Sequence, residues 1–208
     1  MQRTSIALAL ASLAAVTAFA SAPAAAADGP WLVRVRAVNI DSANGGSTNP
    51  DLDLSVNDKV IPEVDISYFF TPNIAAELIL TYPQKHDVKS AGTKIGSLKH
   101  LPPTLLLQYH FDGMGAFKPY VGAGVNYTRF SSVKWDPAVR AALDPSIDKD
   151  SFGFALQAGV DVEISKNVYL NLDIKKVQIR TDVKSAGTKV GEFKVDPLLV
   201  GIGVGFRF

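Results

Sequence analysis

The chain has 208 residues, enough for one domain with a sizeable core, and no cysteine, which excludes a disulfide framework and thiolate metal sites. Its 21 basic and 20 acidic side chains nearly balance, so it has no basic surface for nucleic acid. After the N-terminal region there is no run of about 18 apolar residues, which excludes transmembrane helices.

The first 27 residues have the composition of a secretory signal peptide. A positive start with Arg3 precedes an apolar run over residues 6–20, and small residues end in Ala25-Ala26-Ala27. We expect cleavage before Asp28, which leaves residues 28–208 as the mature domain. The alternative, a membrane anchor, requires a longer apolar run. Export of a chain without cysteine is typical of the bacterial envelope.

From residue 31 onward, apolar residues alternate with polar or small ones. In the first such segment Val33 and Val35 share one face, while Arg34 and Arg36 share the other. In the last, every second residue back from Phe208 is apolar and the alternate set is mostly glycine. This period of two predicts strands with two different faces. The eight predicted strands cover residues 31–40, 59–70, 74–81, 103–111, 120–130, 151–164, 168–181 and 198–208.

Short and long connections alternate between these strands. The turns at residues 71–73, 112–119 and 165–167 are short, whereas the segments 41–58, 83–102 and 131–150 are long. This asymmetry is typical of outer-membrane barrels, with short periplasmic turns and long extracellular loops. The sequence therefore predicts an all-β fold, an eight-stranded antiparallel transmembrane β-barrel in the bacterial outer membrane, with lipid around it and its last strand closing against its first.

Two long connections have features of their own. Asp136 and Pro137 suit the cap and first position of a short helix that ends before Pro145. The segment DVKSAGTKIGSLK, residues 87–99, recurs as DVKSAGTKVGEFK, residues 182–194. The two copies are either matching elements of the barrel rim or hairpin extensions with a tight Ala-Gly turn.

Several segments resemble the OmpW family of small outer-membrane channels. They include HLPPTLLLQYHF, residues 100–111, FKPYVGAGVNYTRF, residues 117–130, and the terminal GFRF. The resemblance covers nearly all of the mature chain. It implies an eight-stranded barrel with a narrow, partly apolar lumen. It also implies passage of small hydrophobic molecules across the outer membrane, with lateral release into the bilayer as a proposed route.

The inward faces of the predicted strands carry many charges. An eight-stranded lumen is just wide enough to be filled by side chains, and buried charges need partners. Arg34 and Arg36 lie next to Glu63 and Asp65 of the second strand, so cross-strand pairs are expected. The network either only holds the barrel together or also blocks ions beneath an apolar funnel. Its predicted members are Arg34, Arg36, Glu63, Asp65, Glu77, Asp173, Lys175 and Arg207.

An apolar funnel requires apolar residues on the inward face, and Ile79 and Leu106 meet this requirement. In the OmpW family, apolar side chains near this level constrict the lumen. We therefore expect Ile79 and Leu106, with Leu54 and Val56 from the first long loop, to line the entrance for solute.

No residue pattern in the chain indicates catalysis or the binding of a metal or cofactor. No nucleophile is paired with a base, so we expect no enzyme and no catalytic residue. His86 and His100 do not make a three-ligand site, so we expect no metal. The segment GIGVG, residues 201–205, precedes no helix, so nucleotide or other cofactor binding is not indicated.

The predicted function is therefore an outer-membrane channel that passively admits small hydrophobic molecules. The alternative is a sealed structural or adhesion barrel whose extracellular loops bind a surface partner. We expect a monomer that does not bind nucleic acid. Gly203, Phe206 and Phe208 of the last strand resemble the signal by which the assembly machinery recognises barrel proteins.

Overall fold

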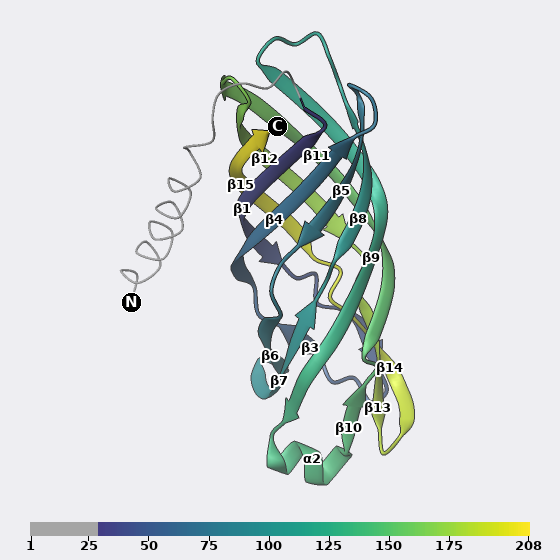
Figure 1. The fold of residues 1–208 in the computed structure, drawn as a ribbon. Coiled ribbons are helices and arrows are strands. Elements are labelled where there is room, and N and C mark those ends of the chain that lie inside the picture. Colours follow the sequence, from purple (N-terminus) through teal and green to yellow (C-terminus); the bar gives the residue numbers. More distant parts are fainter. Residues whose placement is uncertain (1–28) are drawn as a thin grey trace, which may run out of the picture.

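The computed structural model describes residues 29–208, and the expected signal peptide lies outside this range. Eight antiparallel strands form a closed barrel, in which β15 pairs with β1 and β9 pairs with β11 (Figure 1). No helix among the described residues is both long and apolar enough to cross a membrane. The barrel strands are β1 Trp31–Asp41, β4 Lys59–Phe69, β5 Ile74–Leu80, β8 Thr104–His110, β9 Phe117–Trp135, β11 Asp150–Ser165, β12 Val168–Val177 and β15 Leu198–Arg207.

The expected fold and strand order are confirmed, but β9 begins at Phe117 instead of residue 120, and the C-terminal ends of β9 and β12 also differ from the expected ones. β9 runs beyond residue 130 to Trp135, because its C-terminal part pairs with a strand of a long connection instead of with β8. β12 ends at Val177, and the chain resumes as a separate strand at Arg180. Alternation continues through both points, so periodicity alone could not locate them.

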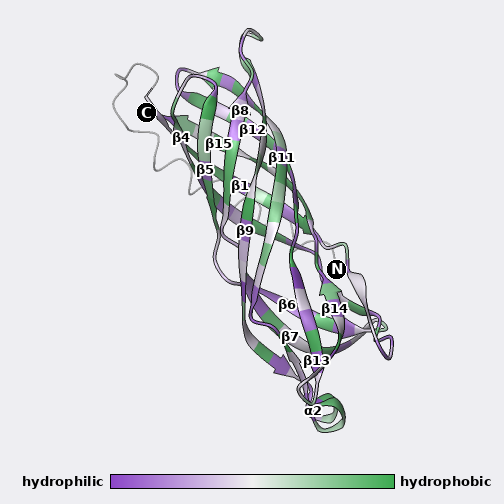
Figure 2. Cartoon of the chain, turned by 90° about the vertical axis from the view of Figure 1, so that its right-hand side faces the viewer, coloured by the Kyte–Doolittle hydropathy of each residue, from purple (hydrophilic) through white to green (hydrophobic). Residues whose placement is uncertain are grey.

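The two faces of the barrel differ as predicted. Outward side chains are apolar, and inward ones are mostly polar, so hydropathy alternates along the strands (Figure 2). At the short-turn end, the Trp31 ring packs on Tyr68 with centroids 4.8 Å apart, and Tyr68 packs on Phe70 at 5.3 Å. Tyr109 and Phe111 add another exposed aromatic pair there. An apolar belt with aromatic residues at its rim fits the hydrocarbon and interface of a bilayer.

Closure between β1 and β15 depends on glycine. Gly203 lies opposite Arg36, and Gly205 lies opposite Arg34. A Cβ atom at Gly203 would lie 2.1 Å from the Val35 carbonyl oxygen and 2.8 Å from the Arg36 Cα atom. The inward glycines therefore leave the room that the two arginines occupy.

The long connections contain more regular structure than the short helix and the hairpins expected from the sequence. Two sheets of strands lie beyond the barrel. The first continues the barrel sheet from β9 in the order β9-β7-β6-β3, and the second is a separate four-stranded sheet in the order β10-β13-β14-β2. A helix, α2 at Pro137–Leu143, is capped by the Asp136 side chain, as expected. The added strands are β2 Gly45–Thr48, β3 Leu54–Val56, β6 Gln84–Ser90, β7 Thr93–Leu101, β10 Pro145–Ile147, β13 Arg180–Ser185 and β14 Thr188–Lys194.

The repeated segments are the central hairpins of these two sheets. β6 pairs with β7 and β13 with β14, each through a two-residue Ala-Gly turn in which both residues have positive φ. The hairpin interpretation of the repeat is thus confirmed. The outer strands also match, since Ser90 lies opposite Leu54 in β3 and Ser185 lies opposite Pro145 in β10.

Hydrogen bonds repeat along with the strands. The Ser90 hydroxyl donates to the Leu52 carbonyl at 2.6 Å, and the Ser185 hydroxyl donates to the Leu143 carbonyl at 2.6 Å. Leu52 begins the segment LDLSV and Leu143 begins LDPSI, a second repeat that is too short to recognise without the structure. The end of the molecule formed by the long connections is thus built from two similar halves.

Candidate functional site: the barrel lumen

A layer of charged side chains fills the part of the lumen nearer the short turns. Arg34 is fully buried and binds Asp161 through two hydrogen bonds of 3.0 and 2.5 Å. It also donates to Glu77 and to the Ser67 hydroxyl, both at 2.9 Å. A guanidinium with several acceptors is the arrangement that burial of an arginine requires.

Arg36 lies one layer further along the same face of β1. It is within 3.4 Å of four carboxylates, on Asp65, Glu77, Glu63 and Asp173. Only the pair with Glu63 joins residues directly opposite in the sheet, and Arg34 does not pair with its opposite residue Asp65. The long guanidinium side chains reach across the narrow lumen, so cross-strand register alone does not predict their partners.

Lys175 completes this layer from β12. Its ammonium group binds Glu63 and lies 3.2 Å from Asp173. Seven of the eight predicted network residues therefore meet. Arg207 does not, because it occupies the last position of β15, where its Nε atom donates to the Gly29 carbonyl at 2.9 Å and its guanidinium lies 4.1 Å from the centroid of the Phe69 ring.

The predicted network lacks two of its actual members. Asp161 is absent from the predicted set, although it is the main partner of Arg34. Tyr120 is 1% exposed, and its hydroxyl donates to Asp173 at 2.8 Å and accepts from Asn171 at 3.0 Å. The signal for Tyr120 was its phase on β9 and the small residue opposite, since a Cβ atom at Gly159 would lie 2.4 Å from the Tyr120 ring.

Between the charged layer and the long connections, the lumen is apolar. Ile79 and Leu106 are 4% and 1% exposed and belong to one cluster with Val56 from β3, against which Leu54 packs. The structure therefore brings the four predicted apolar residues together. Among the other members are Ile40, Ile61, Phe130, Val177, Ile179 and Leu199.

A small cavity of about 30 Å³ lies where the apolar cluster meets the charged layer. Its walls include Ile61, Ile79 and Leu199, and its floor includes Glu63 and Lys175. A volume of this size holds a water molecule. A larger solute enters only if the surrounding side chains move.

The barrel wall has a gap next to this cavity. Pairing of β4 with β5 ends at Val64 opposite Leu80, and beyond it the Thr81 hydroxyl donates to the Pro62 carbonyl at 3.0 Å. The backbone of residues 58–61 has no strand partner on that side among the described residues. Pairing resumes only at Asn57, whose side chain accepts from the Asp87 N–H at 2.8 Å. We call the interval between these two contacts the wall window.

Proline accounts for the wall window. Pro62 stands on one edge and Pro83 on the other, and Pro102-Pro103 follow where β5 would continue its pairing with β8. Proline has no N–H and cannot donate to a ladder. The other half of the barrel shows the contrast, because there the Gln178 N–H donates to the Phe154 carbonyl at 2.9 Å and the wall is closed.

The OmpW family profile matches residues 27–208, the whole described chain. The chain belongs to the OmpW family. An uncharacterized outer-membrane protein, y4mB of Sinorhizobium fredii, is 44% identical over 187 residues, which are 86% of this chain and 80% of that protein. The dibenzothiophene metabolism operon protein PahQ of Pseudomonas aeruginosa is 29% identical over 203 residues, 90% of this chain and 93% of that one.

The crystal structure of the outer-membrane protein OprG from Pseudomonas aeruginosa superimposes with a TM-score of 0.75 at 26% identity. The match covers 86% of this chain and 96% of OprG. This OmpW-family barrel thus lies in the lipid of the bacterial outer membrane. Its short turns are periplasmic, and the two sheets formed by its long connections are extracellular.

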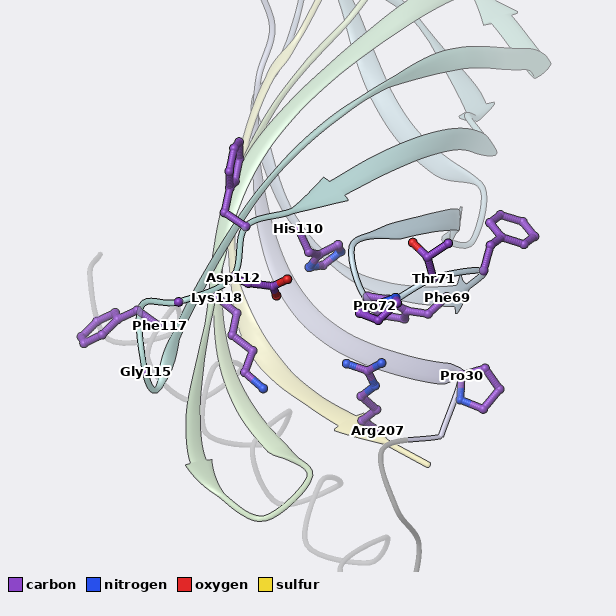
Figure 3. Close-up of a pocket in the computed structure, with 13 residues that line it drawn as sticks. Pro30, Phe69, Thr71, Pro72, His110, Asp112, Gly115, Phe117, Lys118 and Arg207 are labelled. Atoms are coloured by element: carbon purple, nitrogen blue, oxygen red, sulfur yellow. The ribbon is translucent and has the colours of Figure 1, made fainter.

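A second, larger cavity of about 480 Å³ lies at the periplasmic mouth of this OmpW-family barrel. The side chains of His110, Lys118 and Arg207 point into it, beside Phe69 (Figure 3). The charged layer lies between this cavity and the apolar cluster, since His110 stacks on Tyr120 with centroids 5.0 Å apart. The two cavities are therefore parts of separate compartments.

Proposed function

We propose that this protein is a channel through which small hydrophobic molecules pass the outer membrane passively. The observation that carries the proposal is the apolar part of the lumen, which lies beside the wall window and on the extracellular side of the charged layer. An apolar solute gains by entering such a lumen, because it leaves water without losing hydrogen bonds. Ions and sugars lose their hydration there and find no compensating partners.

The wall window supplies an exit that avoids the charged layer. Val60, Leu80 and Tyr82 are exposed on the outer surface around it and face the hydrocarbon. A solute that moves from the apolar cluster through the wall window reaches lipid without crossing the ion pairs. Transport of this kind follows the solute's own gradient and needs no energy source.

The name of one relative supports this proposal. PahQ belongs to an operon for the metabolism of dibenzothiophene, an apolar aromatic molecule. Cells that degrade such compounds must first pass them through the polar saccharide surface of the outer membrane. A barrel whose lumen is apolar on the extracellular side fits that task.

Three further expectations belong to the proposal. We propose that the protein is a monomer and is not an enzyme. We also propose that the assembly machinery recognises its last strand, in which Phe206 and Phe208 end the outward apolar face and Gly203 lies on the inward one. Phe208 is 57% exposed on the folded barrel, where it faces the surrounding lipid.

Uptake by intact cells tests the channel. Gram-negative cells without an OmpW-family protein of their own receive the full chain, and accumulation of p-xylene and of sucrose is measured. We expect faster accumulation of p-xylene and no change for sucrose. Equal rates for p-xylene with and without the protein would show a sealed barrel, the alternative in which the extracellular sheets bind a surface partner.

A further inference from the structure

Two buried hydrogen-bond acceptors without partners lie on the inner face of β6, beside the wall window. Gln84 and His86 are 0% and 1% exposed, and they share one face of the strand because they are two residues apart. The Gln84 Oε1 atom and the His86 Nε2 atom have no hydrogen-bond donor. A buried acceptor that lacks a donor is costly, so such atoms mark a place where a ligand can bind.

The other polar atoms of both side chains are engaged, which fixes the chemistry of the free ones. His86 Nδ1 lies 2.9 Å from the Asn57 carbonyl oxygen, which can only accept, so Nδ1 carries the proton and Nε2 holds a lone pair. Burial lowers the pKa of His86, which keeps the ring neutral. The Gln84 amide nitrogen donates to the Tyr82 carbonyl at 2.9 Å, which leaves Oε1 as the free acceptor.

His100 connects these acceptors to the lumen cavity. It lies opposite Gln84 in the β6–β7 ladder, and its ring stacks on His86 with centroids 4.7 Å apart and planes inclined by 15°. His100 also lines the small cavity together with Ile61 and Ile79. The surroundings are thus apolar on one side and rich in free acceptors on the other.

The second half of the barrel lacks this arrangement. Thr181 stands where the first repeat has His86, one residue before the repeated Asp-Val-Lys segment. Its hydroxyl donates to the Asp148 carbonyl at 2.9 Å, just as His86 donates to the Asn57 carbonyl. Thr181 lacks the second ring nitrogen of His86, and Ile179 stands where the first repeat has Gln84. The free acceptors occur on the side of the wall window and not in the equivalent hairpin.

We infer that Gln84, His86 and His100 form a binding subsite for small apolar molecules that carry one O–H or N–H donor, such as phenols, indoles and short alcohols. The inference rests on the proposed channel function and specifies its substrate class. A solute of this class places its apolar body among Ile61 and Ile79 and its donor on the β6 acceptors. A solute without a donor leaves both acceptors unpaired and is bound less well.

A matched pair of probes tests the subsite. p-Cresol and p-xylene have nearly the same shape, and only p-cresol has a hydroxyl group. In the cell assay above, we expect His86→Phe and Gln84→Leu each to lower the p-cresol rate about fivefold, the effect of one lost hydrogen bond, and to leave the p-xylene rate unchanged. The matched control is Thr181→Val in the other half, which should change neither rate.

A spectroscopic measurement separates the subsite from a merely structural role. The full chain with 15N-labelled histidine is placed in phosphatidylcholine vesicles, and p-cresol is added. We expect the His86 Nε2 signal to move as this atom accepts a hydrogen bond, with no such movement for p-xylene.

The possible failures are distinct. If neither probe enters cells faster with the protein than without it, the proposed function fails. If p-xylene enters but the variants change both probes equally and the His86 signal does not move, the subsite is refuted and a trapped water molecule satisfies the acceptors. Loss of both rates in His86→Phe, with the Nε2 signal of the wild type moving on addition of p-cresol, would still support the subsite.

Discussion

Arg34 on β1 and Asp161 on β11 face each other across the lumen, joined by hydrogen bonds of 3.0 and 2.5 Å. β12 and β15 lie between these strands in the barrel wall, so the pair spans the lumen instead of linking neighbours. Both side chains are buried. The contact therefore sets the spacing of two walls that no backbone hydrogen bond connects directly.

Removing one partner of this pair should destabilise the barrel strongly. Arg34→Met leaves Asp161 without its cation and removes one of the two arginines that bind Glu77, and the expected loss is about 3–5 kcal/mol of unfolding free energy. Urea titration of folding into lipid vesicles measures it. Arg129→Met is the control, because Arg129 and Asp150 form an exposed pair that contributes little. Equal effects of the two substitutions would contradict a structural role for the charged layer.

A charge among the apolar side chains should block the channel. Ile79→Asp places a carboxylate in the apolar cluster, and we expect uptake of p-xylene to fall more than about tenfold, since burying an unpaired charge is costly. Ile79→Leu keeps the apolar volume and should keep most of the rate. Unchanged uptake in Ile79→Asp, with the barrel folded, would show that solute does not pass this level.

The wall window should narrow when its proline edge is removed. Pro62→Val supplies an N–H that the ladder between β4 and β5 can use, and we expect p-xylene uptake to fall by roughly threefold while stability rises slightly. Pro145→Val, in β10 of the other half and away from the small cavity, is the control. An increase in uptake would argue against exit through the wall window.

Acid should loosen the first hairpin through its histidine pair. Burial lowers the pKa of His100 to about 3, whereas an unfolded histidine titrates near 6.5. Between these values the unfolded hairpin binds more protons, so folding stability is full above pH 6.5 and falls as the pH drops towards 3. The slope approaches about 1.4 kcal/mol per pH unit.

Hydrogen exchange of the β6–β7 amides at pH 7 and pH 4.5 measures this loss. His100→Phe should reduce the difference between the two pH values, since Phe does not titrate. If the wild type and the variant lose the same protection, His100 is not the group responsible.

The two hairpins should respond alike to equivalent substitutions. Ser90→Ala and Ser185→Ala each remove a hydroxyl that donates to a carbonyl at 2.6 Å. We expect each to lower the local stability of its own hairpin by about 1 kcal/mol, as measured by hydrogen exchange. A large effect at one serine and none at the other would contradict the structural equivalence of the halves.

The sequence by itself determined the barrel, its closure and the content of its lumen. A period of two carries that information, because each strand must present one face to lipid and the other to the lumen. It placed Arg34, Arg36 and Lys175 inward and Ile79 and Leu106 among them. It also predicted the α2 helix and the repeated hairpins, because caps and Ala-Gly turns are local signals.

Only the tertiary structure decided which side chains contact one another in the lumen. Arg34 pairs with Asp161 across the lumen, and Arg207 stays at the periplasmic mouth, because long side chains reach partners that strand register does not specify. The wall window depends on prolines from three separate segments, and the acceptors of Gln84 and His86 are free only in the packed structure. Contacts between residues distant in the chain depend on how the closed barrel places its strands. A periodic pattern gives the face on which each side chain lies, but not the distance between side chains on different strands.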